Sequence, residues 1–373
     1  MHVPFIDLHR SVNPIEKAVH QDWQNALANC EFVGGPTVAR LEKSLEDKLD
    51  ASHFTCCSNG TDALMVGMQA MGVKPGMRVA LPNMTFWAPY EAVALLGATP
   101  VLVDMNPDDL QMDFDEFKRG HEQFRFDAAI LVHLFGWASS RLQEFRDYCK
   151  ENEITLIEDG AQSFGVTYNG ESVYKNAQLA TISFYPAKVF GGCGDGGGIT
   201  TDDPTTGEKI RALCNHGRAG HYTYDYVGWN ARMGGLTAHY LMRMLEQIDG
   251  FVESRLQAEA FYYEYFQHLS DHCKIFKAPE GIKGNGYLAV IQSHSKSGDD
   301  IAGALKDKGI GCARTYPQTI CEQPPAHNAL RTSDLQHSKR FSRQVINLPL
   351  FANITQNECQ ISADALKSVF KDG

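Results

Sequence analysis

The chain has 373 residues, of which 43% are hydrophobic and 21% are charged, a composition typical of a globular protein large enough for two domains. Its 34 Lys and Arg residues against 45 Asp and Glu residues give a formal net charge of −11, which argues against a nucleic-acid-binding protein with a basic face. No run reaches the roughly 18 apolar residues of a membrane helix, and the N-terminal residues do not resemble a secretory signal. The cysteines lack CxxC spacing. We therefore expect a cytoplasmic protein without a membrane partner.

Short apolar runs alternate with helical patterns from residue 53 onward. The expected order is a strand over 53–57, a helix over 61–71, a strand over 77–81, a helix over 85–96, strands over 101–104 and 130–135, a helix over 141–152 and a strand over 154–158. Further strands are expected over 180–184 and 198–201, followed by a helix over 208–215. This alternation predicts an α/β fold with a mainly parallel sheet flanked by helices.

The pattern changes after Gly235. A long helical stretch over 236–269 is interrupted only by Gly250. The remaining expected elements are strands over 287–292 and 312–316 and helices over 300–308 and 362–370. We therefore expect a large α/β domain over residues 1–250 and a smaller C-terminal α+β domain over residues 251–373.

The densest glycine cluster lies between Gly191 and Gly198 and contains the spacing GxGxxG from Gly192 to Gly197. A dinucleotide-binding fingerprint needs a strand before it and a helix directly after it. A short strand and a turn are expected after Gly198 instead, so a nicotinamide-linked dehydrogenase is rejected. A glycine-rich turn with a close backbone approach is the simpler interpretation.

Two candidate reactive side chains follow predicted strands. Lys188 stands in an apolar and aromatic setting, where loss of water favours the neutral amine that condenses with carbonyl groups, although a surface lysine is the alternative. Asp159 closes the strand over 154–158, at the edge where parallel sheets bind ligands, and a helix N-cap is its alternative role. His268 and His272 are one helical turn apart, but no further ligand has suitable spacing, so we predict no metal.

Two further features suit a flat, phosphorylated ligand. The turn at Gly60 and Thr61 begins a helix whose free N–H groups and dipole can bind an anion, or it only caps the helix. Phe86 opens the helix over 85–96, where its ring can stack on a heteroaromatic ring or pack in the core. Together with Asp159 and Lys188, these groups meet the needs of pyridoxal 5'-phosphate.

A series of short motifs resembles, in order and spacing and over nearly the whole chain, the DegT/StrS (DegT/DnrJ) family of pyridoxal-phosphate-dependent sugar aminotransferases of fold type I. The motifs are Val3-Pro4-Phe5-Ile6-Asp7-Leu8, Phe32-Val33-Gly34-Gly35-Pro36, Asn59-Gly60-Thr61-Asp62-Ala63-Leu64, Pro82 with Thr85, Glu158-Asp159-Gly160-Ala161-Gln162-Ser163, Ser183-Phe184-Tyr185-Pro186-Ala187-Lys188, Gly194-Asp195-Gly196-Gly197, Gly217-Arg218 and Trp229-Asn230-Ala231-Arg232-Met233.

The resemblance implies that Lys188 forms a Schiff base with the cofactor and that Asp159 pairs with the ring nitrogen. It also implies a homodimer with active sites at the subunit interface. The other matching residues would hold the cofactor or the substrate: Phe86 by stacking, Gln162 near the phenolic oxygen, Gly60, Thr61 and Ser183 at the phosphate, Asn230 at the phosphate from the other subunit, and Arg232 and Tyr316 at the substrate.

By this resemblance, the chain transfers an amino group from an amino acid, L-glutamate, to a keto group of a nucleotide-linked sugar, for amino-sugar or surface-polysaccharide biosynthesis. Ala231 and Thr315 stand where the family often has tyrosine and histidine, and these departures concern the substrate. One alternative is a dehydratase of the same family that uses pyridoxamine phosphate, but there a histidine replaces the lysine found here at Lys188. The other is a non-catalytic regulator with the same fold.

Overall fold

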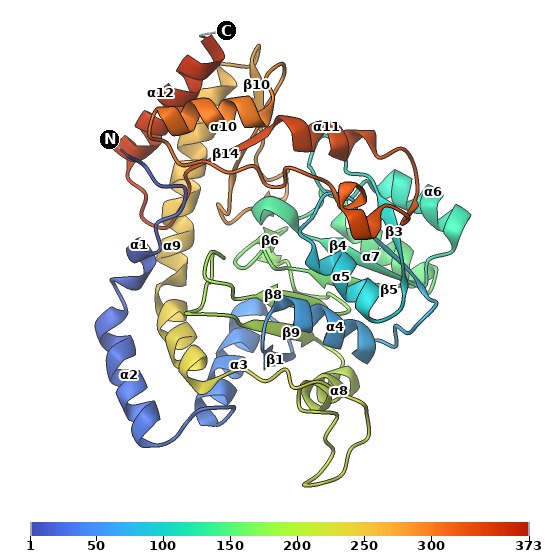
Figure 1. The fold of residues 1–373 in the computed structure, drawn as a ribbon. Coiled ribbons are helices and arrows are strands. Elements are labelled where there is room, and N and C mark those ends of the chain that lie inside the picture. The colour runs from blue at the N-terminus through green and yellow to red at the C-terminus, as the bar shows by residue number, and fades with distance from the viewer. Residues whose placement is uncertain (1, 372–373) are drawn as a thin grey trace.

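An eight-stranded sheet lies at the centre of the computed structural model, which describes residues 2–371 (Figure 1). Its strand order is β1-β9-β8-β5-β4-β2-β3-β13. These strands are β1 (His53–Cys57), β2 (Arg78–Pro82), β3 (Thr99–Val103), β4 (Ala128–Val132), β5 (Thr155–Asp159), β8 (Ala180–Ser183), β9 (Gly197–Thr201) and β13 (Leu330–Arg331). Neighbours from β8 to β13 are parallel, whereas β9 is antiparallel to both β1 and β8. The predicted mainly parallel sheet is confirmed.

Helices flank this sheet and connect its strands. They are α3 (Pro36–Leu49), α4 (Gly60–Ala70), α5 (Ala88–Leu95), α6 (Phe114–Phe124), α7 (Leu142–Glu151) and α8 (Pro204–Cys214). Helix α4 packs against strands β8 and β9 and helices α5 and α8. These elements bury the side chains from Ala63 to Met68, and the helix can pack in this way because it is apolar along most of its length. This packing holds the first turn of α4 against the carboxyl ends of the strands.

Smaller sheets and further helices, drawn from both ends and the middle of the chain, complete the structure. A three-stranded antiparallel sheet contains β10 (Cys273–Ile275), β12 (Ala289–Ser293) and β14 (Val345–Leu348), and another contains β6 (Thr167–Tyr168), β7 (Glu171–Ser172) and β11 (Ile282–Lys283). The remaining helices are α1 (His9–Val12), α2 (Glu16–Ala28), α9 (Gly235–Gln267), α10 (Gly298–Asp307), α11 (Gln336–Gln344) and α12 (Gln356–Lys371), with short 3-10 turns at Leu134–Gly136, Ile320–Glu322 and Pro324–Ala326.

The buried apolar residues form two clusters. The larger surrounds the eight-stranded sheet. The smaller lies among α9, α10, α12 and β12, and Val3 joins it, because the Val3 N–H donates to the carbonyl oxygen of Gly309 at 3.1 Å and the Val3 carbonyl oxygen accepts from Gly311 at 2.7 Å. Helix α9 carries residues of both clusters and continues through position 250 (Figure 1). A domain boundary near residue 250 stays a prediction.

Three local predictions are wrong. Helix α9 is continuous through Gly250, since its packing against α2, α3 and α12 outweighs the low helix propensity of one glycine. The expected strand over 312–316 is reduced to a single bridge at Ala313, because the next donor, Thr315 N–H, bonds the Asn347 side chain at 2.9 Å. The expected strand over 130–135 ends at Val132 and continues as a 3-10 turn.

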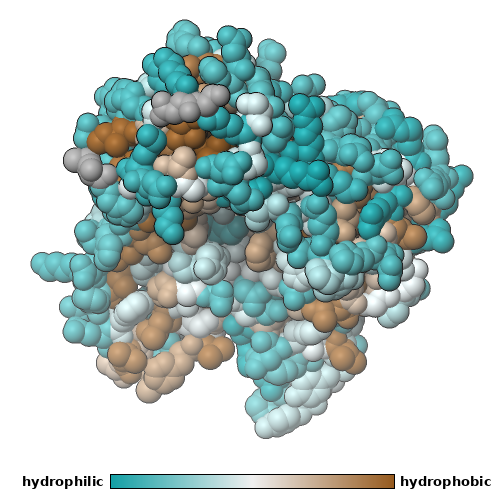
Figure 2. Space-filling model, turned by 45° about the horizontal axis from the view of Figure 1, so that its top comes forward, coloured by the Kyte–Doolittle hydropathy of each residue, from teal (hydrophilic) through white to brown (hydrophobic). Residues whose placement is uncertain are grey.

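No helix within residues 2–371 has the length and apolar character needed to span a bilayer. The face in Figure 2 is largely hydrophilic, with hydrophobic side chains in smaller patches between polar ones.

A buried ion pair joins strand β5 to helix α7. Glu158 is fully buried, and its carboxylate accepts from Arg146 Nε at 2.7 Å, from Arg146 Nη2 at 2.9 Å and shares a 2.9 Å hydrogen bond with His133 Nε2. Burial acts to raise the pKa of Glu158, but Arg146 and His133 prevail and hold this pKa below its ordinary value. The pair fixes helix α7 to the strand that ends at Asp159.

Replacing Arg146 with leucine leaves this carboxylate buried without its cation, and we expect the free energy of unfolding to fall by roughly 3–5 kcal/mol. Because the pKa of Glu158 is lowered in the folded protein, the stabilisation is present above the ordinary glutamate pKa of roughly 4.3 and is lost as the pH falls through the folded value. Urea unfolding at about pH 7 and about pH 3 measures both effects.

Arg141→Leu is the matched control, because Arg141 stands directly before the same helix and, within residues 2–371, pairs only with half-exposed carboxylates, those of Glu144 and Asp115. Its expected effect is below about 1 kcal/mol. Equal losses in the two variants would contradict a special role for the buried pair.

Candidate active site

A cavity of about 840 Å³ opens where strands β1, β4, β5 and β8 end. Ligands of open parallel sheets bind at this edge. Of the ten site residues predicted from the sequence, eight line this cavity: Gly60, Thr61, Phe86, Asp159, Gln162, Ser183, Lys188 and Tyr316. The structure therefore brings together residues from five separate stretches of the chain.

The two predicted reactive groups share the cavity. Burial raises the pKa of Asp159 above its ordinary value, while the Ala161 N–H, which donates to Oδ1 at 2.9 Å, and the charge of Lys188 act in the opposite direction. A buried carboxylate of this kind gains from a cationic partner. The Nζ atom of Lys188 donates to the hydroxyl of Tyr287 at 3.5 Å.

The first turn of α4 forms one wall. Asn59 caps the helix by accepting the Asp62 N–H at 2.8 Å, so the N–H groups of Gly60 and Thr61 stay available to an anion. Gly60 meets the end of β8 so closely that a Cβ at this position would lie 2.9 Å from Cβ of Ser183. Glycine is therefore required for the helix start and Ser183 to line the same pocket.

Hydrogen bonds fix the orientation of the Gln162 amide. Its Oε1 accepts the Phe135 N–H at 2.6 Å, and because that backbone group can only donate, Nε2 must face Tyr316, whose hydroxyl oxygen accepts at 2.9 Å. The Tyr316 hydroxyl thus keeps its own proton for another acceptor. Its ring lies 6.2 Å from the ring of Phe86.

The other two predicted residues lie outside the cavity of their own chain. Asn230 and Arg232 are both exposed, and Arg232 Nη2 donates to Asn230 Oδ1 at 2.6 Å. A second Arg232 nitrogen donates to the Asn215 side chain at 3.1 Å. Both residues belong to the segment between α8 and α9, which bonds Ser58 N–H through the carbonyl oxygen of Ala231.

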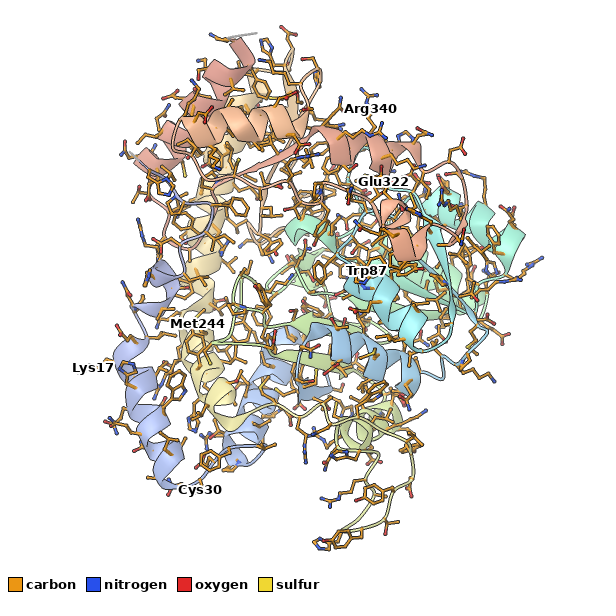
Figure 3. The ribbon with its side chains drawn as sticks, in the orientation of Figure 1. Lys17, Cys30, Trp87, Met244, Glu322 and Arg340 are labelled. Atoms are coloured by element: carbon orange, nitrogen blue, oxygen red, sulfur yellow. The ribbon has the colours of Figure 1, made fainter. Side chains whose placement is uncertain are left out.

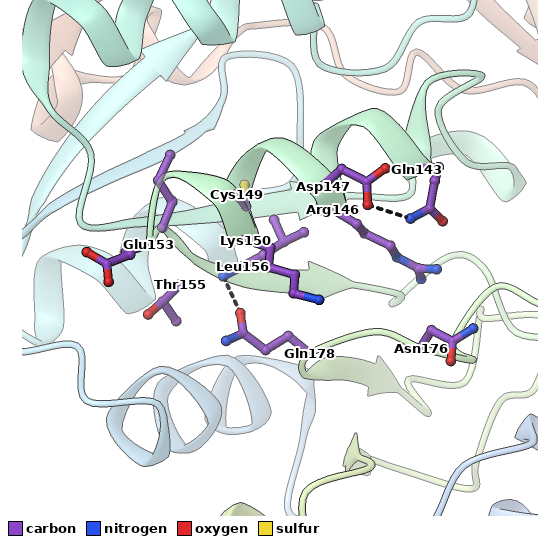
Figure 4. Close-up of a pocket in the computed structure, with 11 residues that line it drawn as sticks. Gln143, Arg146, Asp147, Cys149, Lys150, Glu153, Thr155, Leu156, Asn176 and Gln178 are labelled. Carbon is purple, nitrogen blue, oxygen red and sulfur yellow. Dashed lines mark hydrogen bonds between the residues drawn. The ribbon is translucent and has the colours of Figure 1, made fainter.

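Among residues 2–371, the main cavity is accompanied by smaller hollows, which include the following two. The first, of about 420 Å³, adjoins it at Phe86 and lies between the start of α5 and residues 316–325, the segments that carry the labelled Trp87 and Glu322 in Figure 3. The second, of about 520 Å³, is bordered by α7 and the start of β5, and Figure 4 shows Gln178 and the other side chains around it. This second hollow shares no residue with the main cavity.

Tyr287 and Asn285 are not among the site residues predicted from the sequence. Tyr287 lines the cavity just before β12, whereas the sequence pattern made it the first residue of a strand. Asn285 accepts the Tyr287 N–H through its side-chain oxygen and is fully buried. No local pattern marks either residue, since only the folding of the chain brings them to the ends of the large sheet. Within residues 2–371, no group of three or more His, Cys, Asp or Glu side chains is arranged to hold a metal ion.

Comparisons with known proteins agree with this geometry. A family model described as the DegT/DnrJ/EryC1/StrS aminotransferase family matches residues 13–367. A UDP-2-acetamido-2-deoxy-3-oxo-D-glucuronate aminotransferase of Pseudomonas aeruginosa is 30% identical over 98% of this chain and 99% of its own length. A pleiotropic regulatory protein of Geobacillus stearothermophilus is 27% identical over 100% of this chain and 99% of its own. A crystal structure of NtdA from Bacillus subtilis with bound cofactor PMP has a TM-score of 0.92 and 26% identity, covering 99% of this chain and 85% of the other.

Proposed function

The chain belongs to the DegT/DnrJ/EryC1/StrS aminotransferase family, and from that premise we propose that it uses pyridoxal 5'-phosphate to transfer an amino group from L-glutamate to a keto group of a nucleotide-linked sugar. The observation that carries the proposal is the meeting of Lys188, Asp159 and the start of α4 in one cavity. The Pseudomonas aeruginosa relative is named for an amino transfer to such a sugar. Amino-sugar or polysaccharide biosynthesis in the cytoplasm is the setting that we propose.

The groups of the cavity fit pyridoxal phosphate. The buried Asp159, whose pKa is raised by burial, gains from a protonated ring nitrogen. The N–H groups at the start of α4 suit the phosphate, with Ser183 beside them. The amine of Lys188 suits the aldehyde, and the half-exposed ring of Phe86 offers a face for stacking.

When bound, the cofactor supplies an electron sink for the bond-breaking step. Lys188 would hold the cofactor through its amine, and Nζ, once free of the cofactor, would move a proton to and from the α-carbon of the amino donor. Asp159 would keep the proton on the ring nitrogen of the cofactor through its negative charge. Gln162, whose Oε1 accepts the Phe135 N–H and whose Nε2 donates to Tyr316, would use the remaining N–H of Nε2 to hold the phenolic oxygen of the cofactor. Arg232 and Tyr316 are proposed to bind the substrate.

Reduction with borohydride tests the proposal. A lysine-bound cofactor absorbs visible light, and reduction should fix its mass on the peptide that contains Lys188. Glutamate-dependent amination of a panel of keto-sugar nucleotides then identifies the sugar. A protein saturated with cofactor that develops no visible band would contradict the proposal.

The same measurements separate two rivals. A dehydratase of this family carries a histidine in place of the lysine, and Lys188 disfavours it. A regulator without catalysis has some support in the name of the Geobacillus stearothermophilus relative. A chain that binds the cofactor but turns over no donor or keto sugar would favour the regulator.

We also propose a homodimer in which Asn230 completes the partner's phosphate site. Asn230 and Arg232 are exposed outside their own cavity. The neighbouring loop projects from the body of the molecule between α8 and α9 (Figure 1) and exposes Tyr222, Tyr224 and Val227. Large apolar side chains gathered on one projecting segment are typical of an interaction surface.

Mixing two inactive variants, Lys188→Ala and Asn230→Trp, should restore activity. In a mixed dimer with shared sites, both lesions fall in one site and leave the other intact, so random exchange of equal amounts yields about one quarter of the wild-type sites. The measurement is amino transfer after subunit exchange, followed by native mass spectrometry. Proven exchange without recovery, or a fully active monomer, would contradict the shared site.

A further inference from the structure

Tyr287 is the side chain in hydrogen-bond contact with the amine of Lys188. The hydroxyl oxygen lies 3.5 Å from Nζ, and Nζ lies 5.3 Å from the centre of the ring. Both side chains line the main cavity. Within residues 2–371, no other hydrogen bond holds this amine.

The backbone at Tyr287 is fixed by a buried asparagine. Asn285 Oδ1 accepts the Tyr287 N–H at 3.0 Å, and Asn285 Nδ2 donates to the carbonyl oxygens of Gln162 and Phe164, each at 2.9 Å. Because Asn285 is fully buried, water does not compete for these hydrogen bonds, and they hold the Asn285 side chain in one orientation. The segment before β12 is thereby tied to the loop that follows Asp159.

Gly136 also contacts Asn285 and Tyr287 and restricts their positions. The carbonyl oxygen of Gly136 accepts the Asn285 N–H at 3.1 Å. A Cβ at Gly136 would lie 2.4 Å from Asn285 Oδ1 and 2.8 Å from Cβ of Tyr287, and its φ of +98° also suits glycine. The tyrosine is therefore set firmly against the 3-10 turn that follows β4.

We propose that Tyr287 is a positioning residue for Lys188, an inference that rests on the function proposed above. A lysine amine on its flexible four-carbon stem has many orientations once it is freed from the cofactor. The fixed hydroxyl of Tyr287 accepts one N–H of this amine and keeps Nζ beside the reacting carbon. A displacement of about 1 Å in such a group costs roughly a hundredfold in rate.

The variant Tyr287→Phe tests this role, because it keeps the ring and removes only the hydroxyl group. In stopped-flow mixing with glutamate, we expect the rate constant for loss of the visible band to fall about tenfold to a hundredfold. The half-saturating glutamate concentration and the dissociation constant of the cofactor, measured by equilibrium titration, should change by less than about threefold.

Tyr148→Phe is the matched control, since Tyr148 lies on α7 and does not line the cavity, and it should react like the wild type. A wild-type protein whose band does not respond to any donor would refute the proposed function rather than the role of Tyr287. If the wild type responds, an equal rate in Tyr287→Phe overturns the inference. So does a rate that is restored by saturating cofactor, because Tyr287 would then hold the cofactor and not the lysine.

Discussion

The substitution Lys188→Ala is expected to abolish amino transfer and leave the protein folded. The change removes the amine that we propose to hold the cofactor and move the proton, so the rate should fall by at least about four orders of magnitude. The side chain is half-buried at the wall of a cavity, and its truncation opens no sealed void in the core. The variant should still bind the cofactor through the phosphate and ring contacts.

Amination of the keto sugar measures the loss, and circular dichroism with thermal unfolding measures the fold. Lys175→Ala is a suitable control, because Lys175 pairs with Glu171 and Asp50 at the surface and does not line the cavity. Full turnover by Lys188→Ala would overturn the assignment of this lysine.

Asp159→Asn should separate catalysis from stability. The amide keeps the shape of the side chain and loses the charge that we propose to retain the proton on the ring nitrogen, so we expect the rate to fall by roughly two or more orders of magnitude. Because burial raises the pKa of Asp159, the ionised carboxylate destabilises the protein when no cofactor is bound. The cofactor-free variant should therefore unfold at the wild-type temperature or above it.

The pH dependence follows from the same shift. A carboxyl group with a raised pKa favours folding below its unfolded pKa, and this contribution is lost as the pH rises through the folded value. The stability advantage of the cofactor-free asparagine variant should thus grow from acid to neutral pH, as followed by thermal unfolding of both proteins. Near wild-type activity would reduce Asp159 to a structural residue at the end of β5.

Much of the candidate site can be predicted from local sequence patterns. Asp159, Gly60 and Thr61 follow predicted strands, and a parallel sheet brings such positions to one edge. The apolar and aromatic neighbours of Lys188 indicate a reactive lysine. Each of these inferences needs only residues close together in sequence, and the cavity contains all four residues.

Contacts between distant segments could not be predicted in this way. The hydrogen bonds of Tyr287 to Lys188 and of Gln162 to Tyr316 join residues 99 and 154 positions apart. The predicted strand over 312–316 does not form because the Thr315 N–H donates to the side-chain oxygen of Asn347, a contact that no alternation of apolar residues reveals. Gly250 shows the opposite case, in which tertiary packing overrides a local breaker of helices.

The pairing of Val3 with the chain around Ile310 has a consequence for biosynthesis. Val3 leaves the ribosome roughly three hundred residues before its partners, and contacts of such high separation form slowly. Strand β13 likewise reaches its place beside β3 only after most of the chain has been made. A polypeptide released before these segments are translated leaves apolar side chains of both clusters uncovered. We therefore expect chains that end before these segments to expose apolar surface, to aggregate and to depend on chaperones.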